Sequence, residues 1–280
     1  MVRPFSDSKT TRPPVWSAAV LAGASVLALV ALALHQERDP LPVSLPGVAQ
    51  RPKAPAPPQQ SAWVSPLSRQ CGVQDQTLRQ RLQALQRDLP KRIRRVSIDP
   101  SNYGERTSRD AYGNSVDTNP SLVVLHETVY GIGSAINTFT THHPHDQDQV
   151  SYHLLVGEDG QVVETLDPSK RAFGAGYSAF KGRWDVTNPN MDGSVNNFAL
   201  HLSLETPLDG EDADSAHSGY SSLQYDALAV VLAHWMRRYR IPFEHITTHR
   251  YVDLGGERAD PRSFEWNALQ VRLAALNALC

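Results

Sequence analysis

The sequence has little net charge, few cysteines and no internal repeats. Its 27 lysine and arginine residues are balanced by 29 aspartate and glutamate residues, which leaves a formal net charge of −2. A balance this close to neutral lacks the basic excess of nucleic-acid-binding proteins, so we expect no nucleic-acid partner.

Only two cysteines are present, Cys71 and Cys280, so the chain can form no more than one internal disulfide. In an oxidising compartment they could pair and join the two ends of a domain. The alternative is two free, inert thiols, but exposed free thiols are a liability, and we therefore favour the disulfide. A lipid anchor is not expected, because no small-residue lipidation box precedes a cysteine near the N-terminus.

One long segment has no charged residue at all. Residues 16–34 are almost entirely apolar, and Arg3, Lys9 and Arg12 precede them. This layout is typical of a secretory signal peptide or an N-terminal membrane anchor, which we assign to residues 1–35. The segment approaches bilayer length, yet Ala31-Leu-Ala33 could serve as a cleavage site. Both alternatives place the rest of the chain in the periplasm or cell envelope, with membrane contact if the segment is uncleaved.

A proline-rich stretch follows, with almost no aromatic or branched residues. We interpret residues 36–69 as a semi-extended linker that cannot fold by itself. Residues 70–280 are enough for one domain with a substantial core. Within them, residues 70–117 form an N-terminal extension with one helix near 76–87, where Leu78, Leu82 and Leu85 recur at helical spacing. The main domain spans residues 118–280.

The main domain alternates between strand and helix patterns. Short apolar runs at 122–125, 198–205 and 246–249 predict strands, and Asp159-Gly160 between 151–156 and 161–165 predicts a hairpin. Helices are expected to start near Ser134, to run from 221 to about 238 and to close the chain from 266 to 279. This pattern predicts an α/β fold with a central mixed sheet flanked by helices.

Two histidines and one aspartate follow predicted strands or a loop before a helix. His126 and His249 each end an apolar run, and Asp260 lies in Arg258-Ala-Asp260-Pro261. Sites in α/β folds lie where strands end. Two imidazoles and a carboxylate are a common ligand set for a zinc ion that keeps one position open for water. Each residue alone has a structural explanation, but the three in matching contexts predict a catalytic metal site.

Six separated motifs in residues 118–275 resemble the zinc-dependent N-acetylmuramoyl-L-alanine amidases, the family of phage lysozyme-amidases that is related to peptidoglycan-recognition proteins. The motifs are Val-Val-Leu-His126-Glu-Thr, Val150-Ser-Tyr-His153, Ala175-Gly176-Tyr-Ser178, Asn196-Asn197-Phe, Ile246-Thr-Thr-His249 and Arg258-Ala-Asp260-Pro261. The resemblance implies that His126, His249 and Asp260 bind Zn²⁺. It also implies that Arg258, at a position often held by lysine, stabilises the oxyanion.

The implied reaction is hydrolysis of the amide between N-acetylmuramic acid and L-alanine in peptidoglycan or muropeptides, by what we expect to be a monomer. The sequence leaves open whether intact wall or anhydro-muropeptides are preferred. Many members of the family carry a glutamate base where this chain has Ser203. Because residues i and i+2 of a strand share one face, we assign the base to Glu205. Two alternatives remain: a peptidoglycan-binding module without turnover, and a zinc peptidase acting on the stem peptide.

Overall fold

The computed structural model describes residues 52–72 and 75–280. The predicted signal peptide or anchor, residues 1–35, lies outside the described residues, as does the first part of the predicted linker. None of the helices in the described ranges is both long and apolar enough to cross a membrane.

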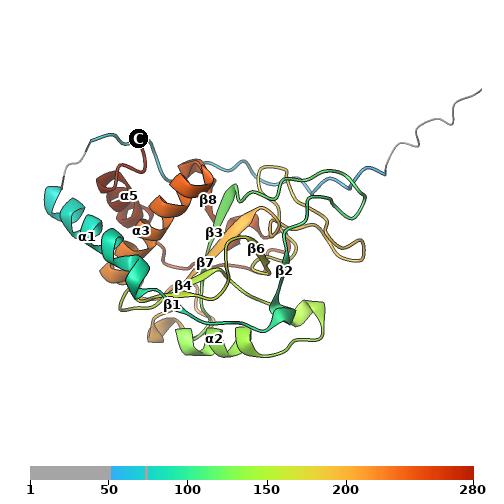
Figure 1. Ribbon diagram of the computed structural model, residues 1–280, viewed down its shortest axis with the longest axis horizontal. Helices are drawn as coiled ribbons and strands as arrows, with labels where there is room; N and C mark the ends of the chain where they lie inside the picture. Colours follow the sequence, from blue (N-terminus) through green and yellow to red (C-terminus); the bar gives the residue numbers. More distant parts are fainter. Residues whose placement is uncertain (1–51, 73–74) are drawn as a thin grey trace, which may run out of the picture. The chain divides into compact units, whose positions relative to one another are not determined.

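A six-stranded mixed sheet forms the centre of the domain, in the order β1-β5-β4-β7-β3-β8 (Figure 1). Its strands are β1 (Arg94–Arg95), β3 (Leu122–Glu127), β4 (Leu154–Val156), β5 (Val162–Glu164), β7 (Ala199–Leu204) and β8 (Ile246–Thr248). Strands β4, β7, β3 and β8 are parallel to one another, whereas β5 is antiparallel to β4 as the predicted hairpin requires. A separate two-stranded sheet pairs β2 (Tyr103–Glu105) with β6 (Lys170–Ala172).

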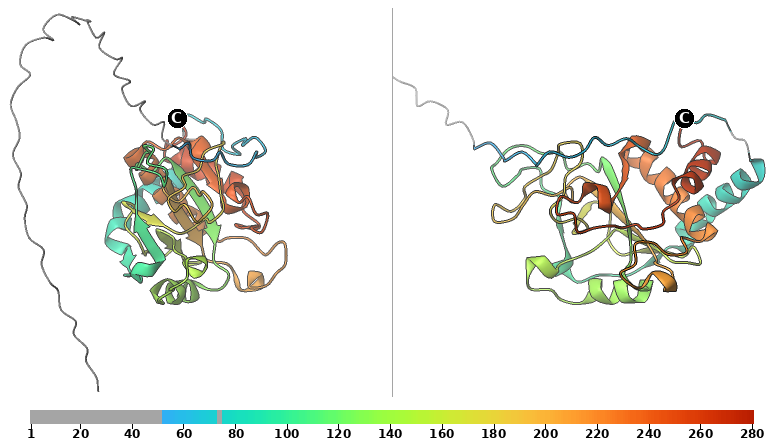
Figure 2. Two further views of the ribbon diagram at one scale, coloured as in Figure 1. Left: turned by 90° about the vertical axis from the view of Figure 1, so that its right-hand side faces the viewer. Right: turned by 180° about the vertical axis from the view of Figure 1, so that it is seen from behind.

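Three long helices cover one face of this sheet: α1 (Gln76–Arg92), α3 (Ser222–Tyr239) and α5 (Trp266–Ala275) (Figure 2). Helix α3 begins with a capping box in which Ser221 and Gln224 exchange side-chain and backbone hydrogen bonds, as expected at this predicted start. Alternate residues of the central strands, such as Val123, Leu125 and Leu200, pack with these helices in the largest apolar core. The predicted α/β fold, with helices flanking a mixed sheet, is confirmed.

The opposite face of the central strands carries the polar residues. His126, His201 and Ser203 are buried there beside Leu122, Val124 and Ala199, one residue out of step with those that contact the long helices. Helix α2 (Ile132–Thr140) packs through Phe139 in a third apolar cluster with β4 and β5. Strict alternation along a strand therefore separates a helix-covered face from the face that carries the candidate site.

The predicted linker is not free of the domain over its described part. Residues 52–69 belong to the same compact unit as the rest of the domain. Leu67 is only 3% exposed in the main core, and the backbone N–H of Gln70 donates to Leu279 O at 3.0 Å. The proline content correctly predicts extended backbone here, but apolar side chains such as Leu67 attach that backbone to the domain.

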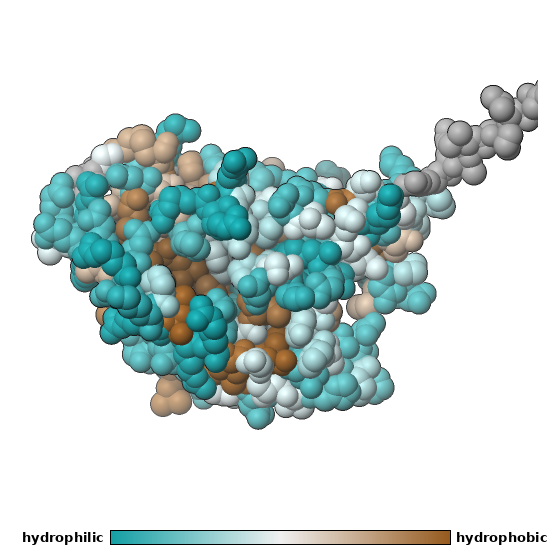
Figure 3. All heavy atoms as spheres, in the orientation of Figure 1, coloured by the Kyte–Doolittle hydropathy of each residue, from teal (hydrophilic) through white to brown (hydrophobic). Residues whose placement is uncertain are grey.

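The predicted disulfide between Cys71 and Cys280 is confirmed, with a Cα–Cα distance of 4.8 Å. It joins the segment that enters α1 to the last residue of the chain, beside the C-terminal end of α5. The face of the molecule drawn in Figure 3 is mostly hydrophilic. On this face, hydrophobic residues reach the surface mainly in a band between α1 and α2.

Candidate metal centre and its cavity

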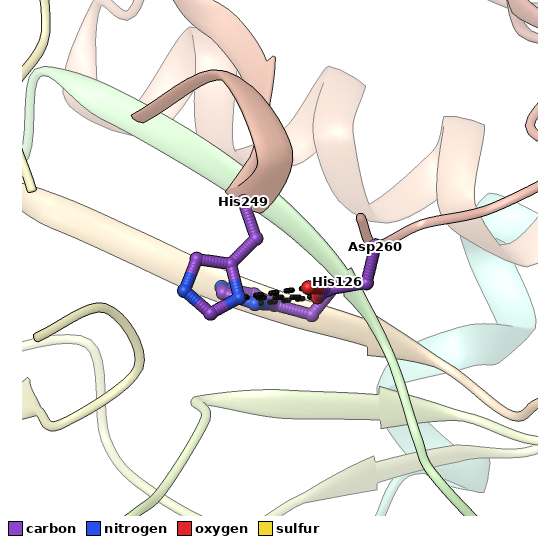
Figure 4. A group of neighbouring side chains, drawn as sticks. All are labelled: His126, His249 and Asp260. Atoms are coloured by element: carbon purple, nitrogen blue, oxygen red, sulfur yellow. Dashed lines mark hydrogen bonds and ion pairs between the residues drawn. The ribbon is translucent and has the colours of Figure 1, made fainter. Parts of the chain in front are cut away.

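The three predicted metal ligands converge from three separate elements. His126 is the penultimate residue of β3, and His249 begins the short helix α4 (His249–Val252) immediately after β8. Asp260 lies in the loop before α5, where its carbonyl accepts a hydrogen bond from Arg250 N at 2.9 Å. Since β3 and β8 are parallel neighbours, both histidines emerge at the same sheet edge. Figure 4 shows the three side chains pointing toward one another.

The distances among the three side chains suit a tetrahedral zinc ion. His126 Nδ1 lies 3.3 Å from Asp260 Oδ2, and His249 Nδ1 lies 3.0 Å from Asp260 Oδ1. Ligand atoms placed at about 2.0–2.2 Å from a tetrahedral zinc are about 3.3–3.5 Å apart. All three ligand atoms lie within 4.8 Å of one another, and no other such group occurs among residues 52–72 and 75–280.

The protonation states also suit metal binding. Burial, reinforced by the nearby His249, lowers the pKa of His126 to about 4, so its imidazole is neutral at pH 7. For Asp260, burial alone would raise the pKa, but the close contacts of its carboxylate with the imidazoles of His126 and His249 outweigh it and hold the pKa well below its usual value. His126 Nδ1 is buried and faces the Asp260 carboxylate, and no hydrogen-bond donor from residues 52–72 or 75–280 reaches it. A buried acceptor without a donor, facing a carboxylate, fits a metal ligand.

A second buried histidine holds the first one in place. His126 Nε2 lies 2.9 Å from His201 Nδ1, and neither side chain is exposed. His201 N donates in turn to His153 Nδ1 at 3.0 Å. With His126 Nδ1 free for a metal, its Nε2 carries the proton and donates to His201. Metal-binding histidines commonly donate their second nitrogen in this way. The sequence analysis did not identify this role of His201.

Arg258, the predicted oxyanion residue, lies at the cavity beside Asp260. Its backbone N–H donates to Asp253 Oδ2 at 3.1 Å. Its side chain is exposed, and within the described parts of the chain its guanidinium has no hydrogen-bond or ion-pair partner. A free, permanently charged donor next to the metal ligands is available to a developing negative charge.

Glu205, the predicted base, has its carboxylate engaged elsewhere. Strand β7, which lies between β4 and β3 in the sheet, ends at Leu204, and Glu205 is the next residue. Its Oε1 accepts from Ile132 N at 2.6 Å, and its Oε2 accepts from Glu158 N at 2.9 Å. Helix α2 has no capping side chain of its own at Gly131, so its free N–H groups attract this carboxylate. Glu205 does not line the cavity, and its role as base stays a prediction.

Ser203 stands opposite His126 in the register of β3 and β7. Its hydroxyl is fully buried and has no hydrogen-bond partner in the described part of the chain. The position predicted to carry a base in other members of the family therefore holds a small polar group close to the metal ligands.

Three residues that line the cavity were not identified from the sequence. Tyr152 stacks on His126 with ring centroids 4.3 Å apart, and burial raises the pKa of its phenol, which stays protonated. In the sequence, its position next to His153 in the Ser-Tyr-His motif was the one feature that pointed to this location. Glu127, next to His126, accepts from Arg262 N at 2.9 Å and pairs with the Arg262 side chain. Arg262 also donates to Asp214 O, so this pair fastens the 212–215 loop, which lines the cavity.

The predicted metal ligands His249 and Asp260 form part of the wall of a large open cavity of about 1500 Å³. Tyr152, Arg171 and Phe173 line it near the sheet, and Trp184 and residues 186–194 line it farther along the chain. Small-molecule sites usually measure about 300–1000 Å³, so this cavity has room for more than one residue of a polymer.

Comparisons with known proteins agree with this geometry. The sequence profile of the N-acetylmuramoyl-L-alanine amidase family matches residues 116–263. The chain is 31% identical over 166 residues to the 1,6-anhydro-N-acetylmuramyl-L-alanine amidase AmpD of Citrobacter freundii, which covers 54% of this chain and 79% of that protein. It is 26% identical over 172 residues to AmpD of Salmonella typhimurium, covering 56% of this chain and 83% of the relative.

The fold is also similar to a solved structure. A crystal structure of a selenomethionine derivative of AmpD aligns with a TM-score of 0.50 and 27% sequence identity, over 65% of this chain and 94% of the other. The profile match covers more than half of the chain and contains all three converging ligands. The chain therefore belongs to the N-acetylmuramoyl-L-alanine amidase family.

Proposed function

We propose that this protein is a zinc enzyme of the cell envelope that hydrolyses the amide between N-acetylmuramic acid and L-alanine in peptidoglycan. One observation supports the proposal most directly: His126, His249 and Asp260 meet beside a cavity large enough for a glycopeptide. The chain also belongs to the N-acetylmuramoyl-L-alanine amidase family, whose name gives hydrolysis of this amide.

His126, His249 and Asp260 would hold the zinc ion, which when bound would lower the pKa of water and act as a Lewis acid. The chain contributes the remaining groups. Arg258 presents an unpaired guanidinium to the carbonyl oxygen as negative charge develops on it. Tyr152, protonated and stacked on His126, can donate a hydrogen bond at the cavity wall. His201 holds the ring of His126 in the orientation that directs Nδ1 toward the metal.

A wall-binding module without turnover is the second candidate. Two observations favour it: Ser203 occupies the position expected of a base, and the Glu205 carboxylate is bound to Ile132 and Glu158. Binding would use the same cavity.

Turnover by the purified full chain separates the candidates. The protein is incubated with intact sacculi and, separately, with soluble 1,6-anhydro-muropeptides, and products are identified by mass spectrometry. Release of stem peptides beginning with L-alanine, lost with a chelator and restored by zinc, is expected. Binding to sacculi without release from either substrate would support the module instead, and cleavage within the stem peptide would indicate a peptidase. Asp260→Ala, which removes one ligand, should abolish both zinc retention and release.

We also propose that the folded unit acts outside the cytoplasm. The apolar segment 16–34 and the Cys71–Cys280 disulfide support this, because disulfides persist in oxidising compartments. Protease added to spheroplasts of the producing cell should digest the protein while a cytoplasmic marker survives. Digestion only after lysis would contradict this location.

A further inference from the structure

The described part of the proline-rich segment is a component of the cavity as well as a connection to the domain. Residues 52–72 run along the edge of the domain toward α1 (Figures 1 and 2). Trp63 anchors the middle of the segment: its Nε1 donates to Glu244 O at 2.9 Å, and its ring lies 4.5 Å from that of Tyr251. Gln60 Nε2 donates to Ala179 O at 3.0 Å. These contacts fix the chain that leads back to Pro55.

Pro55 reaches the cavity and holds one aromatic ring there. Its carbonyl accepts a hydrogen bond from Trp184 Nε1 at 2.9 Å, and both residues line the cavity. On its other side Trp184 lies against Gly193, where an added Cβ would come within 2.2 Å of Trp184 Cδ2. Only glycine permits this approach. Trp184 is therefore held by the hydrogen bond to the Pro55 carbonyl on one side and by close packing against Gly193 on the other.

The surroundings of Trp184 differ from those of the metal ligands. Tyr177 lies 6.0 Å away between ring centroids, and Tyr112 lines the same cavity. Because Pro55 satisfies the single polar atom of the indole, Trp184 offers only apolar ring surface to a ligand. The neutral side chains Thr187, Asn188 and Asn190 line the adjoining wall and supply hydrogen-bond donors and acceptors.

We propose that Trp184 and its neighbours form a saccharide subsite for a pyranose ring of the glycan strand, and that residues 52–58 position Trp184 for it. A pyranose has an apolar C–H face that packs on an aromatic ring, and hydroxyl and N-acetyl groups at its edge that pair with amide and hydroxyl side chains. Trp184 contacts the sugar in this proposal, whereas Pro55 acts through Trp184. The identity of the substrate rests on the proposed function. Trp184 and the predicted metal ligands line one continuous cavity, so a single substrate molecule can contact both.

The test uses glycan strands freed of stem peptides, added to the purified full chain with zinc and again after chelation. Binding is measured by calorimetry. The wild type should bind in both states, because the subsite contains no metal ligand. Trp184→Ala should weaken binding about tenfold, the effect of losing about 1.4 kcal/mol of stacking. Trp184→Phe keeps a ring but loses the bond to Pro55 and should fall between the two. Tyr130→Ala, an exposed aromatic that does not line the cavity, is the matched control and should bind as wild type.

The positioning role of the segment is tested by replacing residues 52–58 with glycine and serine at equal length. We expect this variant to match Trp184→Phe in glycan binding, with an unchanged unfolding midpoint. On sacculi, the replacement and Trp184→Ala should both raise KM with kcat unchanged. Wild-type affinity in the replacement variant would overturn the positioning role, and wild-type affinity in Trp184→Ala would overturn the subsite. If the wild type releases stem peptides but does not bind glycan strands, the subsite is refuted and the proposed hydrolysis stands. If it binds glycan strands but releases no stem peptides, the proposed hydrolysis is refuted and the subsite stands.

Discussion

At the residue scale, the hydrogen bond between His126 and His201 has a consequence for metal affinity. His201 Nδ1 is the acceptor that fixes the tautomer of the ligand His126. His201→Ala removes it and leaves His126 Nε2 buried without a partner, so zinc affinity should fall about 10–100-fold. Competition with a chromophoric chelator measures it. His201→Asn is the matched control, because its side-chain oxygen can replace Nδ1 and should restore most of the affinity. Equal affinities of wild type and His201→Ala would rule out this role.

Glu205 has two possible roles with opposite consequences. As a base, its replacement in Glu205→Gln should lower kcat at least 100-fold and leave stability unchanged. As the acceptor of Ile132 N and Glu158 N, its replacement should leave most of kcat and cost about 1–2 kcal/mol of folding free energy. The contacts lead us to expect the second result. Turnover on sacculi and a urea unfolding curve of the same preparation distinguish the two roles, and a large loss of kcat at unchanged stability would establish the base.

Of the three predicted ligands that converge, His126 lies at the end of a strand and His249 directly after one. His126 and His249 could be predicted because strand ends in parallel sheets meet at one edge. Glu205 could not be placed by the same rule, since its orientation depends on the N-terminus of α2, a partner distant in sequence. Tyr152 and Arg262 could not be placed either, because their positions follow from packing against His126 and Glu127.

At the scale of elements, most helices and strands were predictable because each has a local signal. The α3 capping box, the Asp-Gly hairpin and the apolar strands are local in sequence, and each formed as expected. The described proline-rich segment was not predictable as part of the domain. Its composition indicates extended backbone, but whether such backbone is free or packed depends on a few residues such as Leu67 and Trp63 and on the surfaces that receive them.

Leu67 allows a direct test that this segment belongs to the folded unit. The side chain is 3% exposed within the main core, so Leu67→Ala should cost about 2–4 kcal/mol. The neighbouring Val64 is 80% exposed, and Val64→Ala should change stability by no more than about 0.5 kcal/mol. Urea unfolding of both variants at pH 7 gives the comparison. If both variants unfold like wild type, the segment contributes nothing to the fold.

At the scale of the whole molecule, buried neutral histidines make the protein sensitive to acid. Burial, together with the charge of Arg106, lowers the pKa of His153 to about 3 from 6.5. Because the folded-state pKa lies below the unfolded value, the unfolded chain binds the proton first as pH falls. The contribution of neutral His153 to the folding free energy is therefore fully present above about pH 6.5. It declines between pH 6.5 and 3, and about 2 kcal/mol of it is lost at pH 5.

The variant His153→Asn isolates this contribution. Asparagine keeps an acceptor for His201 N but does not titrate, so its loss of stability between pH 7 and pH 5 should be about 2 kcal/mol smaller than that of wild type. Urea unfolding of the zinc-free proteins at both pH values measures the difference. Identical losses in the two proteins would show that His153 does not titrate as its burial requires.

The disulfide closes a loop that contains almost the whole domain. It joins the end of the segment 52–72, which lines part of the cavity, to Cys280. Cys71 and Cys280 are 209 positions apart, and constraining a loop of this length removes much of the conformational freedom of the unfolded chain. Replacing both with serine should therefore cost about 2–5 kcal/mol. Because Leu67 and Trp63 hold residues 52–70 to the folded state independently, the native variant should keep its glycan affinity at 25 °C while its thermal midpoint falls. A lower glycan affinity in the folded variant would instead show that the disulfide itself positions the cavity wall.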